Sequence, residues 1–488
     1  MKYTLKEILA NTSSYLFYRR GEEIFNKTYR PTILLKEVKP DGDIIYFPFS
    51  AVVNDIPTET FCDIEAAIIK GARAFAFDEE RMRDRKFLDM LYDILRKYKD
   101  RIDFVIMTQN ALNAMFLLAQ YTRAKKFSKD LKVICVTGSI GKTSTTEMVY
   151  SIFKQKHKIF RGDPMVNLRL RINHKLIEAD SDCEYLLFEC SGAIKGYLKK
   201  FSELLVPDGV ILSKVGTENL GKYGSIQNIA DEKCSLMTCL RPDSTAVLND
   251  SPEIRNAAKD YNCKQIFTKE GDYKLIKTDN SGSEFLYKGE KYTLSVVGEH
   301  QINNAIKAIE LAKSFNIDDE SIKKGLFEFQ SVGSRWMTDK YKDAVVVTDA
   351  PNNPSYETMI SCITTFLNIY KDSPLKRVVI SGIRELGTYE KEVHTRLAEF
   401  IAQQDIDELI CVEKEAKTVY DYIKEKAPHI KTVYFDKPED IDENDPFVKY
   451  ILDTLDEKQA LLIKAQGIDP VVMYEKVRLV LNRILKGI

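Results

Sequence analysis

Residues 132–146 read KVICVTGSIGKTSTT, and this stretch decides the fold that we expect around it. The apolar run Val133–Val136 predicts a short buried strand, and the pattern Thr143–Phe153 predicts a helix. Between them, Gly138 and Gly141 allow a tight turn whose backbone N–H groups point at an anion. A strand, a glycine turn and a helix N-terminus in this order are typical of a phosphate-binding loop.

The side chains of this loop predict its ligand. Lys142 supplies a positive charge for the β- and γ-phosphates of a nucleoside triphosphate, and the Thr143 hydroxyl can reach Mg²⁺. We therefore predict a site for ATP and Mg²⁺ formed by Gly138, Ser139, Gly141, Lys142, Thr143 and Ser144. The strict pattern G-x-x-x-x-G-K-[ST] fails, because Val136 occupies its first glycine position. An ordinary strand–turn–helix joint is the alternative interpretation.

Composition limits the class of protein. The chain has 488 residues, of which 44% are hydrophobic, enough for about three domains with cores of their own. Charged residues make up 30% and leave a net charge of −1, which favours neither nucleic acid nor an acidic membrane surface as a partner. We find no apolar run of about 20 residues and no apolar leader. The nine cysteines show no C-x-x-C spacing. These features predict a cytoplasmic protein without membrane insertion.

The alternation of strands and helices predicts an α/β fold with three domains. Residues 1–126 mix strand-like runs such as Thr32–Leu35 with helical patterns, and the polar stretch Ala124–Asp130 reads as a linker. Residues 127–335 alternate buried strands with helices, which indicates a parallel sheet covered on both faces, and carry a strand-rich insert at Tyr273–Val297. Residues 336–488 repeat the alternation and predict a Rossmann-like unit.

The loop form T-G-[ST]-x-G-K-T resembles the ATP loop of the Mur ligase superfamily, the amide-forming ligases of cell-wall peptide assembly. The resemblance extends from Asp63 to Gly467 and is greatest to the D-alanyl-D-alanine-adding branch. The motifs that carry it after the loop keep the order and spacing of that branch; they are Leu187–Gly192, Ile229–Lys233, Gly298–Ala305, Ser334–Arg335, Asp349–Ser355, Arg384–Gly387 and Ile463–Gly467.

The resemblance implies a function. It implies an N-terminal substrate-binding domain, a central ATP-binding domain and a C-terminal ligase domain. The expected reaction activates a substrate carboxylate as an acyl phosphate, which the amine of an amino acid or dipeptide then attacks. The expected partners are a small carboxylate precursor, with a UDP-linked peptide as the family expectation, and the amino acid or dipeptide. We expect the protein to act as a monomer in cell-wall precursor synthesis.

The resemblance also implies roles for residues outside the loop. Glu189 would bind Mg²⁺ together with Thr143, and Lys233 would do so as a carbamate. Lys142, Lys233 and Arg335 would be catalytic. His300, Asn304 and Asp349 would contact the nucleoside, and the substrate-binding residues would be Asn352, Asn353 and Lys464.

Structural alternatives stay open for these residues. Glu189 could be a surface carboxylate, Lys233 a solvated helix lysine and Arg335 part of an interdomain salt bridge. His300 could cap a helix or lie in a core, and Asp349 could cap the following turn, while Lys464 could be structural.

Several positions depart from the family pattern. The pattern N-I-x-x-x-H-L reads Lys214–Leu220 here, without its asparagine and histidine, which puts a second Mg²⁺ site in question. Gln301 and Pro351 replace an asparagine and a tyrosine. These departures motivate three alternatives: a catalytically impaired nucleotide-binding scaffold, a Mur-like ligase with a non-wall substrate, and a small-molecule kinase.

Overall fold

A computed structural model describes residues 1–33, 38–40, 43–48, 63–162, 169–192, 195–331, 336–341, 343–349, 354–436, 441–455, 458–465 and 473–486. The chain divides into two compact units. The first unit contains Met1–Val133, Lys158–Phe188 and Glu203–Val206, and the second contains Ile134–His157, Glu189–Ser202 and Pro207–Ile488. Among the described residues, no helix is long and apolar enough to cross a bilayer.

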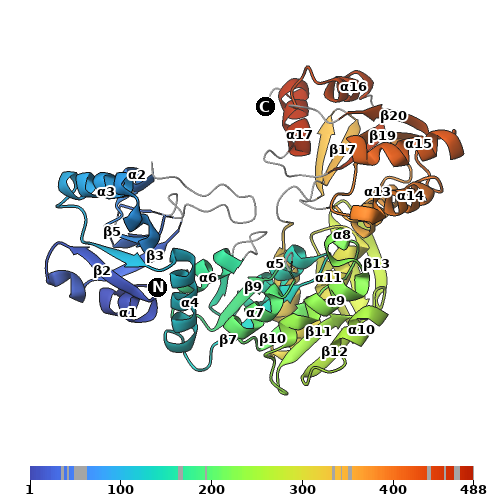
Figure 1. The fold of residues 1–488 in the computed structure, drawn as a ribbon. Helices are drawn as coiled ribbons and strands as arrows, with labels where there is room; N and C mark the ends of the chain where they lie inside the picture. The colour runs from blue at the N-terminus through green and yellow to red at the C-terminus, as the bar shows by residue number, and fades with distance from the viewer. Residues whose placement is uncertain are drawn as a thin grey trace. The chain divides into compact units, whose positions relative to one another are not determined.

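The first unit contains a six-stranded mixed sheet in the order β1-β3-β4-β5-β6-β2 (Figure 1). Its strands are β1 (Tyr3–Thr4), β2 (Ser14–Arg19), β3 (Thr28–Thr32), β4 (Ile44–Tyr46), β5 (Ala74–Asp78) and β6 (Phe104–Thr108). Strands β3 to β6 run parallel, and the edge strands β1 and β2 are antiparallel to their neighbours. The predicted strand Thr32–Leu35 begins at Thr32, the residue at which the observed strand β3 ends. Leu34 and Leu35 lie outside the described residues.

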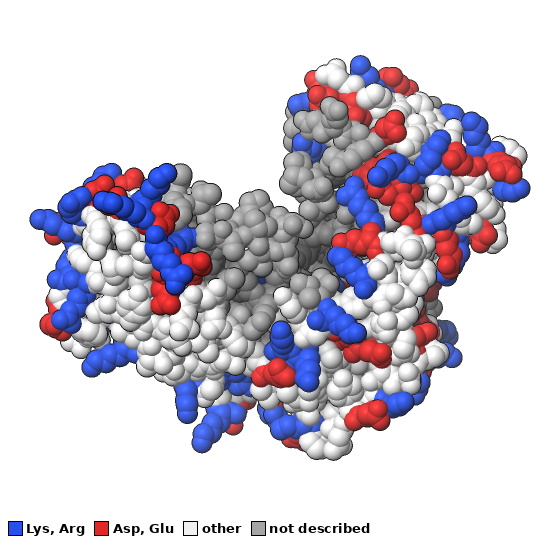
Figure 2. Space-filling view, viewed as in Figure 1, with Lys and Arg blue, Asp and Glu red and all other residues white. Residues whose placement is uncertain are grey.

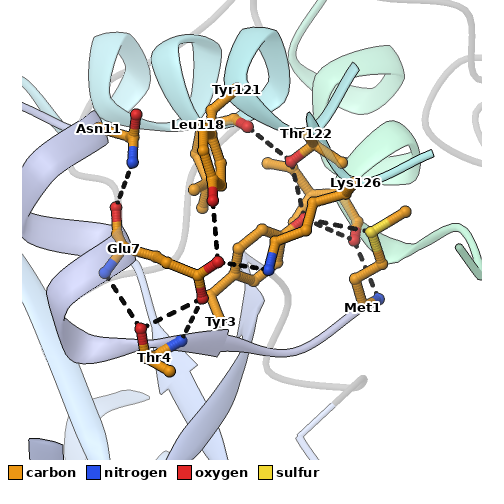
Figure 3. A network of polar contacts seen from close by, with 10 residues as sticks. Met1, Tyr3, Thr4, Glu7, Asn11, Leu118, Tyr121, Thr122 and Lys126 are labelled. Atoms are coloured by element: carbon orange, nitrogen blue, oxygen red, sulfur yellow. Dashed lines mark hydrogen bonds and ion pairs between the residues drawn. The ribbon is translucent and has the colours of Figure 1, made fainter. Parts of the chain in front are cut away.

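Helices α1 (Leu5–Asn11), α2 (Asp63–Lys70), α3 (Arg85–Lys97) and α4 (Ala111–Lys125) complete this part of the first unit. The predicted linker at Ala124–Asp130 therefore begins inside α4 and is wrong over its first two residues. A polar network joins α1 to the end of α4 (Figure 3). The Glu7 carboxylate closes a capping box with Thr4 and accepts hydrogen bonds from Tyr121 Oη at 2.8 Å and Lys126 Nζ at 2.5 Å.

The residues Lys158–Phe188 also belong to the first unit. They add β8 (Ile159–Arg161), α6 (Arg169–Glu178) and most of β9 (Tyr185–Glu189), and β8 and β9 pair in parallel.

In the second unit, parallel strands carry the phosphate-loop stretch. The order β12-β11-β10-β7 places β7 (Lys132–Thr137) next to β10 (Gly209–Leu212), followed by β11 (Thr245–Asn249) and β12 (Lys264–Thr268). The helices of this part are α5 (Lys142–Phe153), α7 (Tyr197–Leu205), α8 (Leu220–Tyr223), α9 (Ile226–Cys234), α10 (Pro252–Ala258), α11 (Glu299–Ser314) and α12 (Asp319–Glu328). The strand-rich insert predicted at Tyr273–Val297 is an antiparallel sheet of β13 (Lys274–Asp279), β14 (Gly282–Tyr287) and β15 (Glu290–Leu294).

A further six-stranded sheet follows in the order β16-β17-β21-β18-β19-β20. Its strands are β16 (Met337–Tyr341), β17 (Ala344–Asp349), β18 (Leu375–Ser381), β19 (Glu408–Val412), β20 (Lys431–Phe435) and β21 (Gln459–Lys464), all parallel except β16. Its helices are α13 (Tyr356–Ile369), α14 (Glu390–Ile401), α15 (Lys417–Lys426), α16 (Pro446–Thr454) and α17 (Met473–Lys486). The predicted α/β class is confirmed. The domain boundaries at residues 126 and 335 stay predictions.

Candidate active site

The phosphate loop has the geometry that its glycines predict. Strand β7 ends at Thr137, and helix α5 begins at Lys142 with Gly141 as its N-cap. Gly138 and Gly141 have φ angles of +140° and +83°, which favour glycine. A Cβ atom on Gly138 would lie 2.0 Å from Ser213 Oγ, and one on Gly141 would lie 2.3 Å from Asn304 Oδ1. Neither position can carry a side chain without a local rearrangement.

The loop is held from one side and retains polar groups for a ligand. The backbone N–H groups of Ser139 and Ile140 both donate to the Lys214 carbonyl, at 2.9 and 3.1 Å. The buried hydroxyls of Ser139 and Thr145 have no hydrogen-bond partner among the described residues. The first turn of α5 adds N–H groups that no intrahelical carbonyl can accept. This arrangement suits an anionic phosphate group.

An ion pair lies at the phosphate loop. Lys142 Nζ donates to the Ser139 carbonyl at 3.0 Å and lies 3.0 and 3.3 Å from the two carboxylate oxygens of Glu218. Only 10% of the Lys142 side chain and 14% of the Glu218 side chain are exposed. The carboxylate of Glu218 therefore occupies the position beside Lys142 where a phosphate would be expected. No role for Glu218 was predicted from the sequence.

Lys233 lies in the same cluster of charges. It is in the last turn of α9, and 2% of the residue is exposed. Burial and the nearby Lys142 ammonium lower the pKa of Lys233 to about 8, against the opposing effect of Glu218, Glu232 and Glu189. The alternative of a solvated helix lysine is therefore wrong. A lowered pKa makes the neutral amine, which is the form that reacts with CO₂, more available near neutral pH.

The two nearby glutamates have different surroundings. Glu232 accepts the backbone N–H groups of Gly196 and Leu198 at 2.7 and 3.1 Å, which fixes the start of α7. Glu189 is buried at the end of β9, and the following Cys190 N–H donates to the Val136 carbonyl at 2.8 Å. Glu189 thus lies next to the strand that enters the phosphate loop, and its alternative as a surface carboxylate is wrong.

Oxygen donors that suit Mg²⁺ are present in this cluster. The Thr143 hydroxyl and the Glu189 carboxylate are both buried beside the loop, and hard oxygen ligands are what Mg²⁺ prefers. In the described part of the chain, no three His, Cys, Asp or Glu side chains are placed to hold a metal by themselves. A metal ion at this site would therefore take further oxygen atoms from the nucleotide or from water.

The residues predicted to contact the nucleoside lie on two elements. Asn304 is in α11, and its side chain is held against Gly141 of the phosphate loop. His300 is in the first turn of α11, with Nδ1 3.1 Å from the Ser361 hydroxyl of α13. Asp349 ends β17, where it accepts the Trp336 N–H at 3.2 Å and pairs with Lys464 Nζ at 2.5 Å.

The pair Asp349–Lys464 has a direct structural cause. The two residues are register partners at the ends of the parallel strands β17 and β21. The Lys464 side chain is 1% exposed, so the Asp349 carboxylate neutralises a buried ammonium group. The predicted contacts of Asp349 with ribose and of Lys464 with a substrate carboxylate stay predictions, and in the structure the two side chains pair with each other. The predicted site residues Arg335, Asn352 and Asn353 lie outside the described residues.

Thr217 and Glu357 form a contact that was also missed. Both carboxylate oxygens of Glu357, in the first turn of α13, accept the Thr217 N–H at 3.2 Å. The Thr217 hydroxyl donates to Glu357 Oε2 at 3.1 Å and accepts the Tyr356 N–H at 3.2 Å. The signal available in the sequence was Glu218, which follows Thr217 directly and precedes the position where the family pattern has its histidine. This acidic residue marks the segment as different from the family pattern.

The chain is similar in sequence to a known family and to known proteins. Residues 136–312 match the Mur ligase middle domain family. The chain is 23% identical over 489 residues to the UDP-N-acetylmuramoyl-tripeptide–D-alanyl-D-alanine ligase of Borreliella burgdorferi, covering 95% of this chain and 97% of that protein.

Two solved structures share the fold. A crystal structure of MurF from Acinetobacter baumannii has a TM-score of 0.79 at 19% identity and covers 100% of this chain and 99% of that one. The MurF ligase of Thermotoga maritima in complex with ADP has a TM-score of 0.70 at 20% identity and covers 94% of this chain and 97% of that one.

Proposed function

This chain belongs to the Mur ligase superfamily, and on that premise we propose that it is an ATP-dependent ligase of cell-wall precursor synthesis. The carboxylate substrate proposed is a UDP-N-acetylmuramoyl-tripeptide and the amine substrate is D-alanyl-D-alanine, as the name of the Borreliella burgdorferi relative states for that protein. We further propose that the protein acts as a monomer in the cytoplasm. The observation that carries the proposal is a phosphate loop with a buried lysine, Lys142, beside a buried strand-end glutamate, Glu189.

The proposed reaction has two steps. A substrate carboxylate oxygen attacks the γ-phosphorus of ATP, so that ADP leaves and an acyl phosphate forms. The amine nitrogen then attacks the acyl carbon, the C–O bond to phosphate breaks, and an amide and inorganic phosphate result. Lys142 and the N–H groups of the loop would neutralise and orient the transferred phosphoryl group, and catalysis would consist mainly of positioning and charge stabilisation.

Mg²⁺ would be held by Thr143 and Glu189, with Lys233 as a third ligand once it carries a carbamate. A bound Mg²⁺ would neutralise charge that develops on the phosphate oxygens. Lys233 would react with CO₂ as the neutral amine and release a proton, gaining two oxygen donors and a negative charge. Its pKa of about 8 supports this role.

The remaining roles follow the same proposal. His300, Asn304 and Asp349 would contact the nucleoside, while Arg335 would approach the transferred phosphate. Asn352, Asn353 and Lys464 would bind the substrates. Asn304 supports its assignment through its contact with Gly141, since that contact places its amide next to the phosphate loop.

The test measures phosphate release by the full chain with ATP, Mg²⁺ and UDP-N-acetylmuramoyl-tripeptide, with and without D-alanyl-D-alanine. We expect release to require both substrates and the product mass to be that of the amide. Lys142→Met should lower the rate at least about 100-fold, whereas Lys324→Met, on the exposed face of α12, should leave it unchanged.

The scaffold and the kinase alternatives predict different results in this assay. ATP turnover that does not depend on the amine would contradict a ligase. ADP binding without turnover over a panel of carboxylates and amines would favour a scaffold, and a stable phosphorylated product would favour a kinase.

A further inference from the structure

The segment 214–220 connects the phosphate loop with helix α13. At its start, the Lys214 carbonyl accepts the N–H groups of Ser139 and Ile140. In its middle, Thr217 is held by Glu357 of α13 through three hydrogen bonds of 3.1 to 3.2 Å. Glu218 therefore directly follows a segment that is hydrogen-bonded both to the phosphate loop and to α13, and these bonds define its position beside Lys142.

The charges around Glu218 do not balance once a nucleotide arrives. Lys142 neutralises Glu218 in the structure, at 3.0 Å. Triphosphate oxygens that take over Lys142 would leave the Glu218 carboxylate largely buried, close to new negative charges and in the same cluster as Glu189. A buried carboxylate without a counter-ion is strongly unfavourable, so a second cation has to compensate it.

The cation that enters with the nucleotide meets this requirement. Mg²⁺ travels with nucleoside phosphates, prefers carboxylate oxygens and needs only one or two protein carboxylates in addition to phosphate and water. Lys233 does not meet this requirement, because the carbamate proposed for this residue would add a further negative charge to the cluster.

We propose that Glu218 has two positions in the reaction cycle, as the counter-ion of Lys142 in the empty site and as a ligand of the nucleotide-bound metal ion in the filled site. This inference rests on the proposed function, because it requires a metal–nucleotide complex at the phosphate loop. It assigns to Glu218 a metal-binding role that is additional to those of Thr143 and Glu189. Glu218 and the nucleotide phosphate would also compete for Lys142, which would weaken nucleotide binding when no metal ion is bound.

The proposal predicts opposite effects of one substitution with and without a metal. Glu218→Gln removes the competing charge but keeps the shape of the side chain. In EDTA, we expect Glu218→Gln to bind ADP about tenfold more tightly than the original chain, as the loss of one close charge pair allows. With Mg²⁺ in excess, we expect the factor by which the metal strengthens ADP binding to fall about tenfold or more.

The experiment is isothermal titration of ADP into the full chain, in EDTA and in Mg²⁺. Glu290→Gln is the matched control, because Glu290 pairs with Lys323 at 2.6 Å in the same unit but away from the loop. Its two affinities should equal those of the original chain. Glu218→Asp keeps the charge and the oxygen donors and should retain most of the Mg²⁺ effect. Thermal unfolding of each variant establishes that it is folded.

A second measurement reports on the metal itself. Mn²⁺ replaces Mg²⁺, and electron paramagnetic resonance of free Mn²⁺ gives its affinity for the ADP complex. We expect Glu218→Gln to weaken Mn²⁺ binding about tenfold and Glu290→Gln to leave it unchanged.

The outcomes separate the two parts of the inference from the proposed function. An unchanged Mg²⁺ effect and unchanged Mn²⁺ affinity in Glu218→Gln would overturn the metal-binding role. Unchanged ADP affinity in EDTA would overturn the counter-ion role. Ligase activity is not part of these readouts, so a chain that binds Mg·ADP as expected but forms no amide would contradict the proposed function and leave Glu218 as assigned.

Discussion

At the scale of single residues, Lys307 is a buried charge that the fold tolerates at a cost. It lies in the middle of α11 with 2% of the residue exposed, and its ammonium donates to the Asn303 carbonyl at 3.1 Å. Burial lowers the pKa of Lys307 from 10.5 to about 8, while Glu270 opposes and Lys214 adds to this effect. A lysine whose pKa is lower in the folded state destabilises the fold wherever the unfolded chain holds its proton.

We therefore predict that Lys307→Met raises the free energy of unfolding at pH 7 by about 1 to 3 kcal/mol. The gain should shrink as the pH rises from about 8 towards 10.5, because the lysine then becomes neutral in both states and its burial carries no charge penalty. Urea unfolding at pH 7 and pH 9.5 measures both values. Lys324→Met, on the exposed side of α12, should change them little. A gain that is equal at the two pH values would show that charge is not the cause.

Lys233 provides a second prediction at this scale. If its amine carries a carbamate, ligase activity should fall in buffer depleted of CO₂ and return when bicarbonate is added. Lys233→Arg, which keeps the charge but cannot form a carbamate, should lose at least about 100-fold in activity and gain nothing from bicarbonate. Activity of the original chain that is indifferent to bicarbonate would contradict the carbamate.

Residues of the phosphate loop could be predicted from the sequence because their signal is local. Gly138, Gly141 and Lys142 stand within five positions, and each position has a simple steric or electrostatic reason. Glu218 could not be assigned in this way, since it meets Lys142 across 76 positions and only the folded chain brings them together. The pairing of Asp349 with Lys464 similarly depends on the order of the strands, because β21 lies next to β17 only in the completed sheet.

At the scale of elements, the network of α1 and α4 gives a pH-dependent prediction. Burial raises the pKa of Glu7, but the hydrogen bonds from Lys126, the Thr4 backbone and Tyr121 outweigh it and lower the pKa from 4.5 to about 2. A carboxylate with a lowered pKa stabilises the fold above pH 5, and this contribution disappears as the pH falls towards 2.

Glu7→Gln should thus lower the free energy of unfolding at pH 7 by about 1 to 2 kcal/mol, after allowance for its 26% exposure. The difference from the original chain should vanish near pH 2. Chemical unfolding from pH 7 to pH 2 measures it. Glu65→Gln is the control, because its pair with Lys97 is mostly exposed and should contribute close to nothing. A loss that persists at pH 2 would indicate packing as the cause.

Helices α5 and α12 approach each other through a glycine. A Cβ atom on Gly325 of α12 would lie 2.4 Å from Ile152 Cα and 2.7 Å from the Ser151 carbonyl oxygen, both of them backbone atoms of α5. Gly325→Ala should therefore lower the free energy of unfolding by about 1 to 3 kcal/mol, although alanine is the better helix former. Thermal unfolding measures the change, and Lys324→Ala on the exposed side of α12 should have little effect. An unchanged or raised melting temperature would show that the two helices can move apart freely.

Strands that are buried apolar runs could be predicted from the sequence, whereas a strand that depends on its neighbours could not. Strands β10, β11 and β17 are continuous apolar runs, buried on both faces, and their positions follow from composition alone. Strand β3 has the sequence TYRPT, which shows no continuous apolar run. It is a strand because it pairs with β1 and β4, and this pairing cannot be read from its own residues.

At the scale of the whole molecule, basic and acidic residues are nearly equal in number, with 72 Lys and Arg and 73 Asp and Glu. Basic and acidic side chains are both present over the face seen in Figure 2. This agrees with a net charge of −1 and with a protein whose proposed ligands are bound in buried clusters such as the one around Lys142.

Within the second unit, several contacts join α8 and the following Gly224 to the segment between β18 and α14. Lys222 pairs with Glu385 at 2.8 Å, the Gly221 N–H donates to the Glu385 carbonyl at 3.0 Å, and Tyr389 Oη donates to the Gly224 carbonyl at 2.7 Å. These contacts could not be predicted from the sequence motifs, because they depend on how two parts of the second unit pack against each other.

The bonds between Thr217 and Glu357 limit how this protein can be recombined with its relatives. A chimera that takes the phosphate-loop part from one ligase and the α13 part from another would separate the two ends of this contact. A hybrid without an acceptor at the position of Glu357 would leave the Thr217 N–H without its partner, one position before Glu218. Engineers who exchange parts of this fold would have to transfer Thr217 and Glu357 as an inseparable pair.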